Sequence, residues 1–252
     1  MYNDLFTVFG LTVHGYGLMI GLGVVASLML SWRRARQKGV SEDTVSTMTI
    51  LAVVIGFIGG KIFFLLTHWS MFMADPWGSL GSEGFVVYGG ILFGFAVCWV
   101  YARLKGERFL FWSDLLLPGV ALAQGFGRIG CFLAGCCYGA PTHSFLGVTF
   151  PAGSFAPAGV ALWPTQLFSS AGDLLLTCVL LRMDRREHYT GKLTVWYLIL
   201  YSVGRFLVEY LRADYRGAVG PLSASQFIGL FVIAGAMFLR SWLKKGRSYE
   251  NK

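Results

Sequence analysis

The sequence Gly-Arg-Ile-Gly-Cys-Phe-Leu-Ala-Gly-Cys-Cys-Tyr-Gly, residues 127–139, places one arginine in surroundings without charge. Arg128 is followed by 44 residues, 129–172, that contain no Asp, Glu, Lys or Arg, and residues 115–127 before it are uncharged as well. A cation is costly to bury in lipid, so it normally faces a polar cavity and a partner. The glycines of the stretch allow close backbone approach or a break in the helix. The stretch therefore predicts a buried site for an anionic group.

The composition places this stretch in a membrane. Of the 252 residues, 55% are hydrophobic and 13% charged, whereas a soluble domain usually carries about 25% charged residues. Asn3 and Asp4 replace the positive charges that would open a signal peptide, so none is expected. We expect an all-α, polytopic membrane protein that forms a single domain over residues 1–252. Seven spans are predicted, at roughly 13–32, 47–66, 85–102, 110–138, 164–182, 193–211 and 223–243. The fourth is too long for one straight helix and should break near its glycines.

The basic residues predict the orientation. Of the 21 Lys and Arg, 16 follow spans one, three, five and seven, while the opposite side carries only Arg212 and Arg216. The positive-inside rule then puts the N-terminus outside and the C-terminus in the cytoplasm. The net charge of +8 is explained as a topology signal, so we expect no nucleic-acid partner.

In this orientation, polar residues of six spans fall in the outer half of the membrane. They are His14, Tyr16, Lys61, Tyr88, Arg128, Gln166, Arg205 and Glu209. Convergence at one depth predicts a site that is reached from the extracytoplasmic side.

The sixth span carries three charges on one helix face, because Arg205, Glu209 and Arg212 are spaced i, i+4 and i+7. One interpretation is an ion pair that only neutralises buried charge. The other adds Arg128: two arginines and one glutamate leave a net positive charge that a phosphate would balance through bidentate contacts.

Several other polar residues have a structural and a functional interpretation. Lys61 either extends towards the headgroups or serves the site. Tyr16 and Tyr88 either belong to an interfacial aromatic belt or hydrogen-bond a lipid headgroup. Asp173 lies inside the fifth span, where a structural hydrogen bond is the simpler interpretation.

The cysteines favour packing over chemistry. None of the five forms a Cys-x-x-Cys pair. The spacing of Cys131 and Cys136 permits a disulfide, whereas adjacent cysteines such as Cys136 and Cys137 rarely form a relaxed one. Free cysteine also packs as a small apolar side chain, so we expect no metal here.

Taken together, these motifs resemble the prolipoprotein diacylglyceryl transferase family over nearly the whole chain. The matching segments are His-Gly-Tyr-Gly-Leu-Met at 14–19, Gly-Gly-Lys at 59–61, Phe-Met-Ala-Asp-Pro at 72–76, Gly-Arg-Ile-Gly-Cys-Phe at 127–132, Pro-Thr-Gln-Leu-Phe at 164–168 and the Arg-x-x-x-Glu-x-x-Arg pattern at 205–212.

The resemblance implies a seven-helix enzyme of the bacterial inner membrane that starts lipoprotein maturation. It would transfer the diacylglyceryl group of phosphatidylglycerol to the lipobox cysteine in the signal peptide of a preprolipoprotein and release glycerol phosphate, without a metal or organic cofactor. Arg128 and Arg205 would bind the phosphate and stabilise the leaving group. The other residues that it assigns to the site are Tyr88 as a catalytic group, and Tyr16, His14, Lys61, Gln166, Glu209, Arg212, Gly130 and Gly139 as substrate-binding.

The chain also departs from the family pattern. Tyr88 stands where the family has a histidine that is often cast as the general base. Cys131 and Cys136 replace a signature Asn and Glu, and Ser169 replaces a Glu. Two rivals to the transferase therefore stay open: a relative that binds or transports an anionic lipid without catalysis, and a thiol-redox membrane protein.

The distribution of basic residues yields a direct test. A reporter fused after Lys252 should be active only in the cytoplasm, and one inserted in the loop 140–163 only outside, because translocation of a basic loop is unfavourable. Paired cytoplasmic and periplasmic reporter enzymes measure this. The reverse pattern would contradict both the orientation and the depth of the site.

Overall fold

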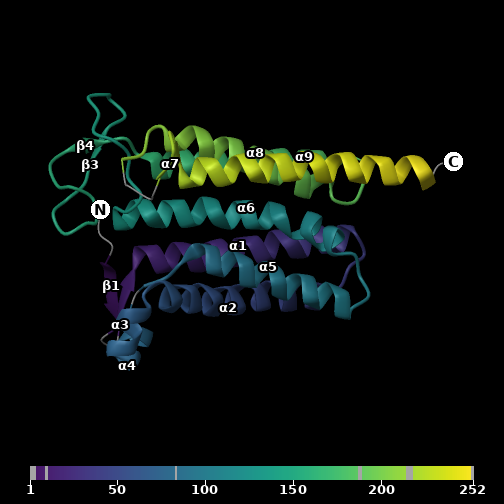
Figure 1. The fold of residues 1–252 in the computed structure, drawn as a ribbon, viewed down its shortest axis with the longest axis horizontal. Helices are drawn as coiled ribbons and strands as arrows, with labels where there is room; N and C mark the ends of the chain where they lie inside the picture. Colours follow the sequence, from purple (N-terminus) through teal and green to yellow (C-terminus); the bar gives the residue numbers. More distant parts are fainter. Residues whose placement is uncertain (1–3, 9–10, 83, 187–188, 214–217, 251–252) are drawn as a thin grey trace. The chain divides into compact units, whose positions relative to one another are not determined.

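The computed structural model is mainly helical, and it describes residues 4–8, 11–82, 84–186, 189–213 and 218–250 (Figure 1). Arg216 and Lys252, which enter the topology prediction, lie outside this part. The helices are α1 Gly15–Gln37, α2 Glu42–Thr67, α3 Trp69–Ala74, α4 Pro76–Gly81, α5 Val87–Leu104, α6 Phe109–Ala134, α7 Thr165–Asp184, α8 Lys192–Glu209 and α9 Ala224–Glu250. The strands are β1 Asp4–Val8, β2 Leu11–His14, β3 Val148–Thr149, β4 Ala161–Leu162, β5 Ala218–Val219 and β6 Leu222–Ser223.

Each predicted span coincides with one long helix. Within the described residues, six helices are long and apolar enough to cross a membrane, namely α1, α2, α5, α6, α7 and α9. The helix at the sixth predicted span, α8, is not among them, and it carries Lys192, Arg205 and Glu209 within 18 residues. The chain is therefore a multi-pass membrane protein, while the count of seven spans stays a prediction.

The helix that contains Arg128, α6, is not broken at its glycines. We expected a break within residues 110–138, but α6 continues through Gly127 and Gly130 and ends at Ala134. The next residue, Gly135, has φ +76°, a left-handed conformation that ends helices and suits glycine. An internal glycine lowers the stability of a helix by only about 1 kcal/mol relative to alanine. The packing of α6 against its neighbours contributes more than that.

The chain folds into two compact units, and each is described by itself. In residues 32–112, α2 packs along α5 through glycines on both helices. A Cβ on Gly59 would lie 2.8 Å from the carbonyl oxygen of Gly89, and one on Gly89 would lie 2.5 Å from that of Gly59. Small residues thus let the two backbones touch, as is usual for helix pairs in membranes.

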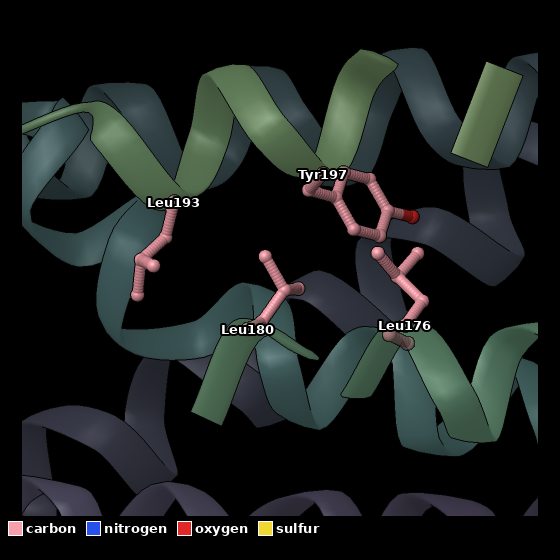
Figure 2. Packing of buried hydrophobic residues seen from close by; sticks show 5 residues of the cluster. Leu176, Leu180, Leu193 and Tyr197 are labelled. Carbon is pink, nitrogen blue, oxygen red and sulfur yellow. The ribbon is translucent and has the colours of Figure 1, made fainter. Parts of the chain in front are cut away.

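The other unit comprises residues 1–31 and 113–252. Its core lies between α6, α7 and α8, where Leu176 and Leu180 of α7 face Leu193 and Tyr197 of α8, with Ala121 of α6 (Figure 2). Many other apolar side chains of these helices are exposed, such as Leu175 at 65% and Leu207 at 61%. Exposed apolar surface of this extent suits contact with lipid tails.

A buried carboxylate on α6 holds the start of α8. Asp114 accepts hydrogen bonds from the backbone N–H groups of Gly191 and Thr194 and from the Thr194 hydroxyl, each 2.7 Å long. The first N–H groups of a helix have no partner within the helix. Asp114 therefore caps α8 from another helix and ties the beginnings of α6 and α8 together.

In the described ranges, three short antiparallel hairpins, β1–β2, β3–β4 and β5–β6, are additions to the expected all-α architecture. The longest loop, residues 135–164, folds around Phe150, Ala156 and Leu162, which pack against Phe132 at the end of α6. This loop carries the turn that contains the cysteines.

The cap supplied by Asp114 should contribute measurably to stability. Asp114→Ala leaves buried N–H groups without an acceptor and should lower the free energy of unfolding by about 3 kcal/mol. Unfolding of the detergent-solubilised protein by heat or denaturant measures this, with Glu107→Ala in the exposed loop before α6 as the control. Equal stability of the two variants would show that α8 does not depend on this cap.

Candidate active site

Two arginines from different helices line one cavity. The cavity lies between α6, α7 and α8 and is partly open, and its empty space of about 430 Å³ includes some of the open space at its mouth. Arg128 lies in the last turns of α6 and Arg205 in the last turns of α8. The polar residues that line it are Arg128, Ser169, Asp173, Tyr201 and Arg205. The structure thus brings together the two cations that the sequence singled out.

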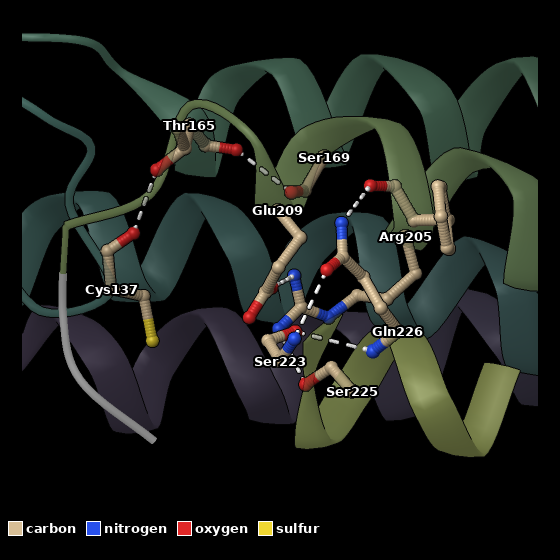
Figure 3. Close-up of polar contacts among 9 residues, drawn as sticks. Cys137, Thr165, Ser169, Arg205, Glu209, Ser223, Ser225 and Gln226 are labelled. Atoms are coloured by element: carbon tan, nitrogen blue, oxygen red, sulfur yellow. Dashed lines mark hydrogen bonds and ion pairs between the residues drawn. The ribbon is translucent and has the colours of Figure 1, made fainter. Parts of the chain in front are cut away.

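Arg205 is held by partners on its own helix and on α9 (Figure 3). Its Nη1 lies 2.5 Å from a carboxylate oxygen of Glu209, and its Nη2 donates a hydrogen bond of 3.1 Å to Ser225 Oγ. Both charged side chains are largely buried, at 15% and 7% exposure. The predicted intrahelical ion pair is therefore present.

A capping box positions the serine that binds Arg205. Ser223 Oγ accepts from the backbone N–H of Gln226, and Gln226 Oε1 accepts from the backbone N–H of Ser223 (Figure 3). This reciprocal pair is a common start for a helix. It begins α9 and orients Ser225 towards the guanidinium.

Arg128 has a different environment. In the part of the chain that the structure describes, it makes no hydrogen bond or salt bridge, although Tyr201 and Asp173 are close enough to interact with it electrostatically. An arginine presents five N–H donors in a planar fork. Arg128 is consequently the group in this cavity with the most donors left for an anion.

Asp173 changes the expected charge of the site. We counted two arginines and one glutamate, which would leave a net positive charge, but the structure adds this carboxyl group of α7 to the cavity wall. Asp173 is 6% exposed and faces the charge of Arg128. Ionised Asp173 and Glu209 together would balance the two guanidinium groups, so an incoming anion competes with Asp173 for Arg128.

Gln166 holds the end of α6 against the start of α7. Its Nε2 donates a hydrogen bond of 2.8 Å to the carbonyl of Cys136, and the neighbouring Thr165 hydroxyl donates one of the same length to Cys137. Gln166 is 1% exposed, and its Oε1 has no hydrogen-bond partner among the described residues. The contacts are structural, and the predicted role in placing a headgroup stays a prediction.

The three cysteines of this turn lie close together. The sulfur atoms of Cys131, Cys136 and Cys137 are all within 4.8 Å of one another. All five cysteines of the chain are free thiols in this structure.

Two predicted glycines are points of close contact. A Cβ on Gly130 would lie 3.2 Å from Tyr16 Cδ2, and one on Gly139 would lie 2.6 Å from the carbonyl oxygen of Leu211. Gly139 forms a β-bridge with Arg212, which follows α8. Gly130 thus lets the start of α1 approach α6 closely, and Gly139 lets the chain at the end of α8 approach the loop that follows α6.

Tyr16 and His14 lie where α1 begins. Tyr16 is 42% exposed in the first turn of α1, and His14 is the exposed last residue of β2, paired with Asp4. Their predicted contact with substrate stays a prediction.

Lys61 and Tyr88 belong to residues 32–112, so their place in a common site also stays a prediction. The Lys61 ammonium donates to the carbonyls of Ser82 and Gly84 at 2.6 and 3.5 Å. Tyr88 lies in the first turn of α5 with 55% exposure.

Tyr201 is the residue of the cavity that our sequence interpretation missed. It lies four residues before Arg205 on α8 and therefore on the same face. That spacing is the signal that could have identified it.

A family model described as prolipoprotein diacylglyceryl transferase matches residues 3–242 of the chain. The chain is 48% identical over 248 residues to the phosphatidylglycerol–prolipoprotein diacylglyceryl transferase 2 of Clostridium perfringens, covering 95% of both chains. It is 44% identical over 237 residues to the corresponding transferase of Clostridium tetani, covering 93% of this chain and 95% of the relative. The transferase of Clostridioides difficile is 31% identical over 243 residues, with 95% and 94% covered.

The buried ion pair of α8 can be tested against an exposed one. Glu209→Gln removes the charge opposite Arg205, and loss of one partner from a buried pair should cost about 3 kcal/mol in the free energy of unfolding. Glu42→Gln, which breaks the exposed pair with Arg36, is the matched control and should change little. Thermal unfolding in one detergent compares them, and equal effects would contradict the burial argument.

Proposed function

Because the chain belongs to the prolipoprotein diacylglyceryl transferase family, we infer that it transfers a diacylglyceryl group from phosphatidylglycerol to a prolipoprotein. The observation that supports this chemistry is that two arginines, Arg128 and Arg205, line one cavity in a membrane protein. Relatives at 44–48% identity bear the name of the same enzyme.

The acceptor in this proposal is the lipobox cysteine at the end of a lipoprotein signal peptide. Its thiol sulfur attacks the glycerol carbon that bears the phosphate ester. A carbon–sulfur bond forms, the carbon–oxygen bond to phosphate breaks, and glycerol phosphate leaves with the electron pair. The thiol proton is lost in the process, so the product is a thioether.

The arginines act on the leaving group. Arg128 binds the phosphate through its fork of N–H donors, displacing the weaker interaction with Asp173. Arg205, kept in place by Glu209 and Ser225, adds the second cation as charge develops on the departing phosphate. Stabilisation of developing charge by fixed donors in a dry cavity is usually the largest contribution to catalysis. Tyr201 lies within the cavity as a further donor for the headgroup.

The general base is the part of the family pattern that this chain lacks. A thiol with an ordinary pKa near 8.5 is only a few per cent ionised at neutral pH, so proton loss is a real step. Tyr88 is a poor base as a phenol, since tyrosine has a pKa near 10. We propose that Tyr88 hydrogen-bonds the lipid headgroup and does not remove the proton.

The site should open towards the extracytoplasmic side of the inner membrane. The last turns of α6 and α8 meet the first turns of α7 and α9 through the contacts of Gln166 and Ser225. Because the ends of α6 and α8 lie at the same level as the beginnings of α7 and α9, Arg128 and Arg205 lie at similar depth. With the basic loops in the cytoplasm, that depth is the outer half of a seven-span protein.

Replacement of Arg128 tests the proposal. Arg128→Lys keeps the charge but loses the planar, bidentate fork, so transfer should fall by roughly 100-fold. The measurement follows radiolabelled glycerol from phosphatidylglycerol onto a lipobox peptide in reconstituted vesicles. Arg182→Lys, on the exposed face of α7, is the matched control and should be near wild type. A wild-type protein that binds phosphatidylglycerol but transfers no label would point to lipid binding without catalysis.

A further inference from the structure

The sulfur atoms of Cys131, Cys136 and Cys137 all lie within 4.8 Å of one another. We expected these residues to pack as small apolar side chains. Three thiols that converge on one point are also the kind of donor set that a soft metal ion prefers. Within the described residues, no His, Asp or Glu joins the group.

The backbone at the end of α6 creates this convergence. The N–H of Cys136 donates to the carbonyl of Cys131 at 3.1 Å, and the N–H of Gly135 donates to that of Phe132 at 3.2 Å. This pair of hydrogen bonds is the Schellman motif, which folds the chain back over the last turn of a helix. It brings Cys136 directly back to Cys131.

Cys137 completes the group at a cost in backbone strain. It has φ +61° and is, in the ranges that the structure describes, the one non-glycine residue with a positive φ. Such a conformation is uncommon outside Gly, Asn and Asp and needs support from its surroundings. The hydrogen bonds from Gln166 and Thr165 to the carbonyls of Cys136 and Cys137 supply that support. The turn is therefore held before any ligand arrives.

We propose that Cys131, Cys136 and Cys137 bind one Zn²⁺ as three thiolates and leave its fourth position open. Binding releases three thiol protons. Three thiolates and one Zn²⁺ carry a net charge of −1, which Arg128, three residues before Cys131 on α6, can balance. A disulfide explains the geometry less well, because it would engage only two of the three neighbouring thiols.

The open position suggests a role in the reaction, and this part rests on the proposed function. Zinc sites with three protein ligands commonly leave the fourth to water or substrate, and a thiol that coordinates zinc is held as the thiolate. The acceptor cysteine would bind there as thiolate, its proton passing to solvent and finally to the released glycerol phosphate. Its sulfur then forms the bond to carbon while the phosphate oxygen leaves. A metal-held thiolate would make a general base at Tyr88 unnecessary.

The metal site can be tested without any activity assay. Full-length protein is purified in detergent under reducing, oxygen-free conditions, and zinc is measured by mass spectrometry. We expect one zinc per chain in the wild type. After removal of zinc, added Co²⁺ should produce a thiolate-to-cobalt charge-transfer absorption in the near ultraviolet.

Variants then assign the ligands. Cys131→Ser and Cys136→Ser should each lower Co²⁺ affinity at least tenfold. Cys137 is replaced by Ala, in case Ser perturbs the turn, and Cys137→Ala should lower the affinity by a similar factor. Cys98→Ser and Cys178→Ser, which lie outside the group, are the matched controls and should bind as the wild type does. A wild type without zinc and without the cobalt absorption, an unchanged affinity in the three variants, or a disulfide among these cysteines under reducing conditions would overturn the proposal.

A lipobox peptide tests the open position. Adding a peptide with cysteine should shift the cobalt spectrum, whereas the same peptide with serine should not. An unchanged spectrum with both peptides would refute substrate binding at the metal. A wild type that shows the cobalt shift but transfers no label would contradict the proposed function alone.

Discussion

A guanidinium inside an apolar helix must find compensation, and the architecture around Arg128 follows from that requirement. Transfer of an isolated charge from water into hydrocarbon is far more costly than any single packing contact. The compensation comes from the polar cavity and from Asp173 and Tyr201 on neighbouring helices, while the second arginine, Arg205, is paired with its own carboxylate, Glu209. Arg205 is neutralised locally, whereas Arg128 keeps its donors. Arg205 is therefore mainly a structural cation, whereas Arg128 can bind a ligand.

The features that arise within one helix could be predicted from the sequence. Six of the long helices follow from length and hydropathy, and the contact of Arg205 with Glu209 follows from a spacing of four residues. Contacts between helices could not be predicted in this way, because nothing in a single sequence says which faces meet. Asp173 was read as structural for that reason, and the cap that Asp114 gives α8 has no sequence signal at all.

Local backbone geometry set a second limit to prediction. Gly135 is a usual residue for a helix end, but a left-handed cysteine directly after Cys136 is not. The convergence of three thiols depends on this unusual residue, whereas the sequence suggested apolar packing because free cysteine usually packs as a small apolar side chain. Positions where the chain departs from local preference are often those where function demands it.

The cap between Asp114 and α8 fixes the relative height of α6 and α8 along their axes. It aligns the beginnings of α6 and α8, which run parallel from that point. Arg128 stands 14 residues beyond Asp114, about 21 Å along α6, and Arg205 stands 11 residues beyond Thr194, about 16 Å along α8. The two guanidinium groups thus differ in height by only about 5 Å, which their long side chains can bridge. One residue inserted in either helix above the cap would raise its arginine by about 1.5 Å and rotate it by about 100°. The spacing between cap and arginine is therefore as much a part of the site as the arginines themselves.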